Sequence, residues 1–101
     1  MTPHRWNPAD GPLTEAGLRA KLESLGYRVA KHVYEPGTIF PDHTHNLDKI
    51  DAVLSGRFRL VVRGHTKVLG PGEWIEIPRG AVHNATVVGD EPVVSLDAVK
   101  L

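Results

Sequence analysis

The sequence contains no cysteine, which excludes disulfide bonds, thiolate nucleophiles and cysteine-bound metal ions. It has no excess of charge, since 12 basic residues balance 12 acidic ones, and so lacks the attraction that nucleic acids and anionic membranes exert on basic proteins. No apolar run reaches the roughly 18 residues that span a bilayer, and the polar first ten residues lack the apolar core of a signal peptide. We therefore expect a cytoplasmic protein with neither a membrane nor a nucleic-acid partner.

One helix is predicted, near the N-terminus. Thr14 can cap its first turn, Gly26 can end it, and leucines at positions 18, 22 and 25 recur along one face. Before it, three prolines and a glycine within 13 residues predict an extended arm. We expect a short helix over residues 14–25 that lies across the rest of the fold.

From Tyr27 onward the chain consists of short apolar runs separated by glycine and proline. The clearest is Arg57–Val62, in which apolar and basic residues alternate as they do in a half-buried strand. The predicted strands are 27–35, 49–54, 57–62, 67–69, 73–77, 82–88 and 93–99. Short strands at this spacing predict an all-β antiparallel sandwich or barrel. With 101 residues, enough for a single hydrophobic core, we expect one domain over 1–101, with an arm and helix in 1–26 and the barrel in 27–101.

Histidine is the most informative residue type here. With six histidines and no cysteine, imidazole and carboxylate groups are the metal ligands that remain. His43 and His45 are two residues apart, so in an extended segment both rings face one side and can bind the same ion. A pair of exposed histidines would give the same short pattern, and this reading stays open on spacing alone.

The surroundings of these histidines form two longer patterns. The first motif, G-x5-H-x-H, runs from Gly37 to His45 and is followed by Gly56; the second, G-x5-P-x-G-x2-H, ends at His83. Together they resemble the two motifs of the cupin superfamily, and the resemblance covers roughly residues 33–99. It implies a double-stranded β-helix, a jelly-roll-like barrel, in which His43, His45 and His83 bind one divalent metal ion such as Fe, Mn, Ni or Zn.

The sequence departs from the family at two motif positions. Lys49 stands where the family has a glutamate as its fourth ligand, and Val87 stands where it has an asparagine. Asn84 is close by, but it directly follows His83 and should face away from it. Three neutral histidines still form a workable site and leave coordination positions for water or a ligand.

Lys49 needs a physical account, because an ammonium about 5 Å from a divalent ion is repelled by several kcal/mol at an effective dielectric near 20. Four explanations are open. The Lys49 amine is deprotonated, pairs with a carboxylate or points out of the barrel, or else the metal ion binds weakly. Asp51 is the expected partner, since residues i and i+2 of a strand share a face. A Lys49–Asp51 pair could orient a bound anion or act as acid and base, which makes both residues catalytic candidates. A solvent-facing salt bridge is an equal alternative.

The remaining distinctive side chains have simpler interpretations. We expect His4, His32 and His65 to be solvated rather than ligating. Trp74 should face outward, unless the helix or a second subunit covers it. Three further residues are expected near the pocket: Phe40 and Leu47 as apolar walls, and Arg79 at the barrel mouth.

Two classes of function fit these features. The first is a small metal-dependent enzyme that acts on a small organic molecule, as a dioxygenase, isomerase or lyase. The second is a non-catalytic module that holds a metal or a small ligand, because the fold alone does not establish catalysis. We also expect a homodimer, because a small barrel leaves sheet edges exposed.

Overall fold

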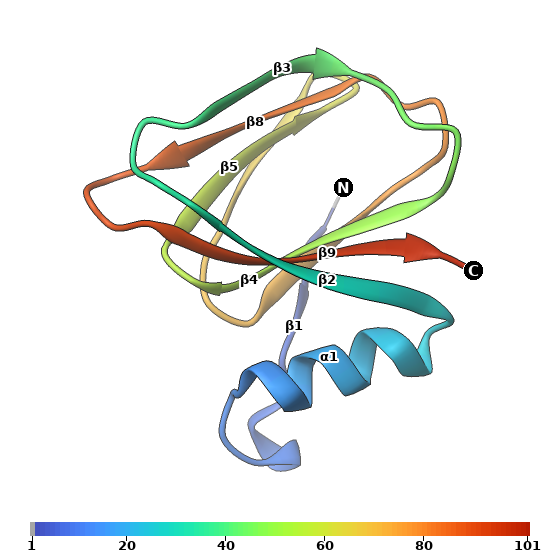
Figure 1. The fold of residues 1–101 in the computed structure, drawn as a ribbon, viewed down its shortest axis with the longest axis vertical. Coiled ribbons are helices and arrows are strands. Elements are labelled where there is room, and N and C mark those ends of the chain that lie inside the picture. Colours follow the sequence, from blue (N-terminus) through green and yellow to red (C-terminus); the bar gives the residue numbers. More distant parts are fainter. Residues whose placement is uncertain (1) are drawn as a thin grey trace.

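Two antiparallel β-sheets face each other in the computed structural model, which describes residues 2–101 (Figure 1). The first has the strand order β1-β7-β4-β9-β2, and the second β3-β8-β5-β6. The elements are β1 (His4–Arg5), η1 (Pro8–Asp10), α1 (Glu15–Ser24), β2 (Tyr27–Tyr34), β3 (Ile39–His43), β4 (Lys49–Ser55), β5 (Arg57–Val62), β6 (His65–Leu69), β7 (Glu73–Ile77), β8 (His83–Val88) and β9 (Val93–Lys100).

The chain changes sheets at almost every connection after β2, and only the β5–β6 hairpin stays within one sheet. This winding produces a jelly-roll-like barrel with one short N-terminal helix, so the predicted fold is confirmed. Arg63 and Gly64 form the hairpin turn with positive φ at both residues, 49° and 81°. This backbone geometry matches the twist of the two flanking strands. The strand after the turn begins at His65, two residues earlier than predicted.

The apolar residues pack in two layers. One lies between the two sheets and contains Phe58, Leu60 and Val62, which alternate with exposed or half-buried neighbours as the sequence predicts. The other lies between the five-stranded sheet and α1, which covers the outer face of that sheet (Figure 1). Trp74 belongs to this second layer and is only 4% exposed. Trp74 therefore faces away from the barrel interior, and the helix covers it. Of the two covers that the sequence left open, the helix or a second subunit, it is the helix.

The helix begins as predicted, since the Thr14 hydroxyl accepts a hydrogen bond from the Gly17 backbone amide at 3.0 Å. The residues before it do not form a simple extended arm, however. They contain the short strand β1, which pairs with β7, and the 3₁₀ turn η1. Proline suits the first position of such a turn, where its missing N–H group has no intrahelical partner. Within residues 2–101, no helix combines the length and apolar character needed to cross a membrane.

Strand β3 lacks a clear counterpart among the predicted strands. It contains Pro41 in its interior, and its register against β8 shifts between Phe40 and His43. A proline and a bulge both interrupt the alternation from which strands are predicted. The bulge lies immediately before His43 and so determines which way that side chain points.

Candidate metal centre

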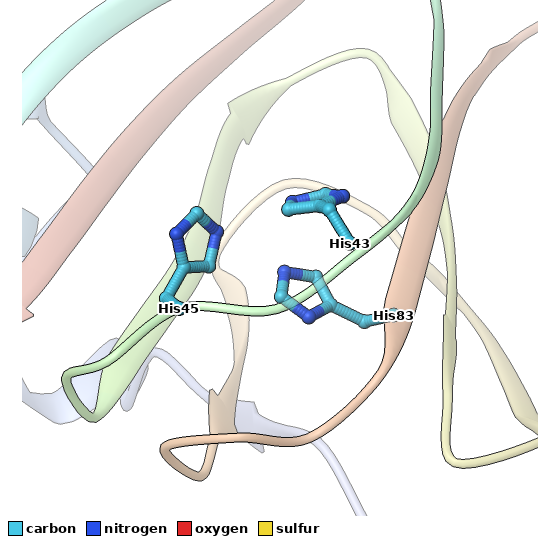
Figure 2. Close-up of side chains that lie close together, drawn as sticks. All are labelled: His43, His45 and His83. Carbon is cyan, nitrogen blue, oxygen red and sulfur yellow. The ribbon is translucent and has the colours of Figure 1, made fainter.

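Three imidazole rings meet at one end of the barrel (Figure 2). His43 ends β3 and His83 begins β8, and the two residues are direct partners in the β3–β8 register. His45 lies in the loop after β3. The ring centroids of His43 and His83 are 4.1 Å apart. The ring centroid of His45 lies 4.8 Å from that of His43 and 5.1 Å from that of His83. The structure thus brings together all three histidines singled out from the sequence, each offering one nitrogen within 4.8 Å of the others.

Backbone carbonyl groups orient two of these rings. His43 Nδ1 lies 2.7 Å from the Pro41 carbonyl oxygen, and His83 Nδ1 lies 2.9 Å from that of Ala81. A carbonyl oxygen can only accept a hydrogen bond, so each Nδ1 donates its proton, and Nε2 is the nitrogen of each ring that is left to bind a metal ion. Each of these hydrogen bonds from Nδ1 to a carbonyl oxygen fixes the tautomer of the ring, as in known histidine metal ligands.

The surroundings of His45 and His83 also favour the neutral form of these two imidazoles. Burial lowers the pKa of His45, and the nearby Lys49 lowers it further. Burial likewise lowers the pKa of His83, which is 3% exposed. Because a metal ion competes with a proton for the same nitrogen, a lowered histidine pKa favours metal binding at neutral pH.

The second motif forms a tight turn that holds the first motif in place. Gly80 adopts a φ of +79°, and its backbone amide donates to the His45 carbonyl oxygen at 2.9 Å. The Ala81 amide donates to the Pro78 carbonyl oxygen at 3.0 Å and closes the turn. Positive φ is readily accessible to glycine and costly for other residues. The glycine of this motif therefore positions a histidine of the other motif as well as starting the strand of His83.

A cavity of about 170 Å³ adjoins the three histidines and reaches into the barrel. Besides the histidines, three aromatic and three charged side chains line it. They are Tyr34, Phe40, Phe58, Lys49, Asp51 and Asp97. The prediction that Phe40 lines the pocket is confirmed. The same prediction for Leu47 is wrong, because this side chain is 53% exposed and lies outside the cavity.

Lys49 enters this cavity and is paired there. Its Nζ lies 2.7 Å from Asp97 Oδ1, and the Lys49 side chain is 12% exposed. The predicted pair with Asp51 is therefore wrong, and so is the alternative of a solvent-facing salt bridge. Asp97 comes from the adjacent strand β9, where it pairs in register with Asp51. Sequence reasoning missed Asp97, because its place beside Lys49 depends on the pairing of β4 with β9.

Asp51 faces Asp97 across the two strands. Burial, and secondarily the negative charge of Asp97, raises the pKa of Asp51 to about 6. Burial also raises the pKa of Tyr34 to about 12, with further contributions from Asp97 and Asp51. Among residues 2–101, Asp51 forms no ion pair, because Lys49 is bound to Asp97. The pocket therefore contains the Lys49–Asp97 ion pair, a carboxyl group that forms no ion pair and a protonated phenol.

The other histidines lie outside this group of ligands. His4 is 3.3 Å from Glu76 and stacks on Trp74, while His32 stacks on Tyr34. Within the described part of the chain, neither they nor His65 belongs to a group of potential metal ligands.

Two polar residues near the histidines, Asn84 and Arg79, are predicted from the sequence to face away from His83 and to lie at the barrel mouth, respectively. Asn84 points away from the metal centre and donates to Asp42 Oδ1 at 2.8 Å. Arg79 is exposed at the turn, and its backbone amide donates to Asp48 Oδ1 at 2.7 Å.

Comparison with known proteins agrees with this arrangement. A family model described as the cupin domain matches residues 30–99. A search of curated proteins gave no significant match. A cupin-like protein from Thermotoga maritima is similar to this chain, with a TM-score of 0.66 and 29% identity over 74% of this chain and 57% of that chain.

Two enzymes are among the similar solved structures. The DMSP lyase DddQ from Ruegeria pomeroyi has a TM-score of 0.67 and 25% identity, over 75% of this chain and 39% of that chain. Salicylate 1,2-dioxygenase from Pseudoaminobacter salicylatoxidans has a TM-score of 0.68 and 21% identity, over 74% of this chain and 22% of that chain. This chain thus spans less than half the length of either enzyme. Because the family model covers most of the chain and the barrel has the matching fold, the chain belongs to the cupin domain family.

Proposed function

We propose that this protein binds one divalent metal ion through His43, His45 and His83 and holds a small organic molecule beside it. The convergence of three imidazoles, with ligand atoms within 4.8 Å of one another, carries this proposal. Imidazole suits Fe, Mn, Ni and Zn ions, and the donor set does not select among them. A bound ion would supply Lewis acidity, with positions left open for water or the organic ligand.

The pocket gives the chain's own residues distinct roles toward such a ligand. Lys49 and Asp51 are the candidates for acid–base work, because both line the cavity next to the histidines. Asp51 is the better base, since a carboxyl pKa of about 6 lies close to neutral pH. Phe40 and Phe58 offer apolar surface that excludes water from the same space.

Catalysis of a dioxygenase, isomerase or lyase type is the first functional candidate. The similar structures include a lyase and a dioxygenase, and those activities belong to those proteins. A non-catalytic binding module is the second candidate. The observation that favours it is the Lys49–Asp97 ion pair, which occupies the position of the fourth family ligand. An oxygen-consumption screen of the metal-loaded protein, followed by product analysis, separates the two candidates.

The metal site itself is tested by substitution and elemental analysis. After loading with zinc and removal of free metal, the parent protein should retain about one ion per chain, as expected for one tetrahedral or more open site. His43→Ala and His83→Ala should each lose most of this metal. His4→Ala and His65→Ala are matched controls that should retain it. Full metal content in both of the first two variants would refute the proposed function.

A further inference from the structure

The pocket presents different chemistry on its two sides. His43 and His83 belong to the four-stranded sheet, whereas Lys49, Asp51 and Asp97 belong to the five-stranded sheet. All five side chains line the same cavity. A molecule in this cavity can therefore contact the histidines on the side of the four-stranded sheet and the charged groups on the side of the five-stranded sheet.

Among the described residues, Asp51 is the carboxylate on the charged side that forms no ion pair. Asp97 neutralises Lys49 at 2.7 Å, which leaves no cation for Asp51 among the described residues. Asp51 also lies directly opposite Asp97 in the β4–β9 register, and like charges in that position destabilise a sheet. A hydrogen-bond donor on a ligand would relieve this situation, since an enclosed carboxylate without a donor is costly. Asp51 is thus available to a ligand in a way that Lys49 is not.

The charges of the loaded pocket determine the charge of its occupant. A divalent ion held by neutral imidazoles, together with Lys49, exceeds the charges of Asp51 and Asp97 by one positive charge. A pocket whose walls are protein has a lower dielectric than water, so it favours an occupant that cancels this excess. One negative charge on the ligand does so, and a carboxylate is a hard oxygen donor that the metal ion can accept.

The volume limits the size of the ligand. A cavity of about 170 Å³ is smaller than the roughly 300–1,000 Å³ of pockets that hold drug-sized ligands, so it suits a small organic molecule. The aromatic side chains of Tyr34, Phe40 and Phe58 give the space an apolar wall. The middle of the ligand is therefore a short carbon segment.

We propose that the pocket binds a small hydroxy acid with one negative charge, whose carboxylate lies at the metal centre and whose hydroxyl group donates to Asp51. This inference rests on the proposed metal site and names the class of molecule that the site takes. Asp97 is a positioning residue in this arrangement, because it holds the Lys49 ammonium and leaves Asp51 free for the ligand.

Three molecules of nearly identical size test this proposal: 3-hydroxypropionate, propionate and β-alanine. Their affinities for the zinc-loaded protein are measured by isothermal titration calorimetry at pH 8, where Asp51 is ionised. Because a hydrogen bond to a charged group is worth roughly 1.5–3 kcal/mol, 3-hydroxypropionate should bind about tenfold or more tightly than propionate. It should also bind more tightly than zwitterionic β-alanine, which does not cancel the excess charge. Zinc content after each titration shows that the acid has not removed the metal.

Variants at Asp51 complete the test. Asp51→Leu removes the acceptor, and Asp51→Asn preserves the shape should the leucine variant fail to fold. Asp51→Leu should reduce the preference for 3-hydroxypropionate over propionate to about twofold or less. Asp51→Asn should reduce it by a smaller factor, because its amide oxygen still accepts a hydrogen bond but carries no charge, and the exposed control Asp90→Asn should keep the full preference. Equal affinity for the two acids in the parent, tighter binding of β-alanine, or an undiminished preference in both variants would overturn the inference. Failure of the proposed metal site is a separate outcome, because it appears as zinc retained by His43→Ala and His83→Ala before any acid is added.

Discussion

Among single residues, Lys49 most clearly distinguishes this chain from the family pattern. It occupies the position of a carboxylate ligand, and the ion pair with Asp97 keeps its ammonium inside the pocket. An uncompensated ammonium close to a divalent ion would weaken metal binding by several kcal/mol. Asp97 offsets much of this repulsion, so the pair explains how a three-histidine site tolerates a lysine.

Substitution of Lys49 should therefore strengthen metal binding. Lys49→Glu removes the cation and supplies a carboxylate ligand, and we expect about a tenfold or greater rise in zinc affinity, equal to roughly 1.4 kcal/mol or more. Lys49→Met only removes charge, so its affinity should rise less. Competition with a chromophoric chelator measures both. Lys31→Met, which removes a partner of Glu15 on the outer surface, serves as control. If neither Lys49 variant exceeds the parent, the lysine does not act on the metal.

A second prediction concerns Asp51 and the dependence of the protein's stability on pH. Its pKa rises from 3.8 in the unfolded chain to about 6 in the fold. Between these values the folded state holds a proton that the unfolded state has lost, so this group lowers stability as pH rises from 4 to 6. Asp51→Asn should accordingly stabilise the metal-free protein by roughly 1–3 kcal/mol at pH 8, and much less at pH 4. Urea unfolding at both pH values measures this, and a gain independent of pH would contradict it.

Among the secondary-structure elements, those with a local signal could be predicted from the sequence. The helix has its cap at Thr14, and β5 shows the alternation of Phe58, Leu60 and Val62. Both signals depend only on neighbouring residues. Strand β3 could not be predicted in the same way, because Pro41 and the bulge break its alternation.

The residues of the candidate site likewise differ in whether they could be predicted from local sequence. The motifs identified His43, His45 and His83, since spacing within each motif is a local property. The partner of Lys49 could not be found by spacing, because Asp97 lies on a strand distant in sequence that the barrel places next to β4. Cross-strand partners depend on sheet order and register, which the local pattern does not encode.

The position of α1 leads to a prediction about this element. Leu22 is fully buried between the helix and the outer face of the five-stranded sheet, away from the histidines. Leu22→Ala should therefore lower the free energy of unfolding by about 2–4 kcal/mol while leaving zinc affinity unchanged. Leu25→Ala, at a position that is 40% exposed, should cost much less. Thermal unfolding and chelator competition on the same samples check both; a loss of zinc affinity in folded Leu22→Ala protein would show that the helix supports the metal centre.

At the scale of the whole molecule, the sheet edges bear on assembly. Trp74 gives no support to a homodimer, since the helix of the same chain covers it. The edge strands β2 and β3 support a homodimer, because they expose two apolar side chains, Val33 at 54% and Ile39 at 66%. Unpaired edges with apolar side chains favour association with a second copy.

We predict a homodimer that uses these edges. Light scattering should then give twice the chain mass of 11.1 kDa. Ile39→Lys should shift the mass to that of one chain, whereas Val68→Lys, at the opposite edge of the same sheet, should not. A single-chain mass for the parent at micromolar concentration would show that the prediction is wrong.

The pairing of His43 with His83 has a consequence for how the protein folds. These residues are distant in sequence and become neighbours only when β3 and β8 have docked. Contacts of this kind form late and slowly, since a long loop must close before they are made. An ion that requires both imidazoles has no site in the unfolded chain, so its binding free energy adds directly to the stability of the closed barrel. Metal supply would then help to set the stability of the folded chain, independently of any chemistry at the site.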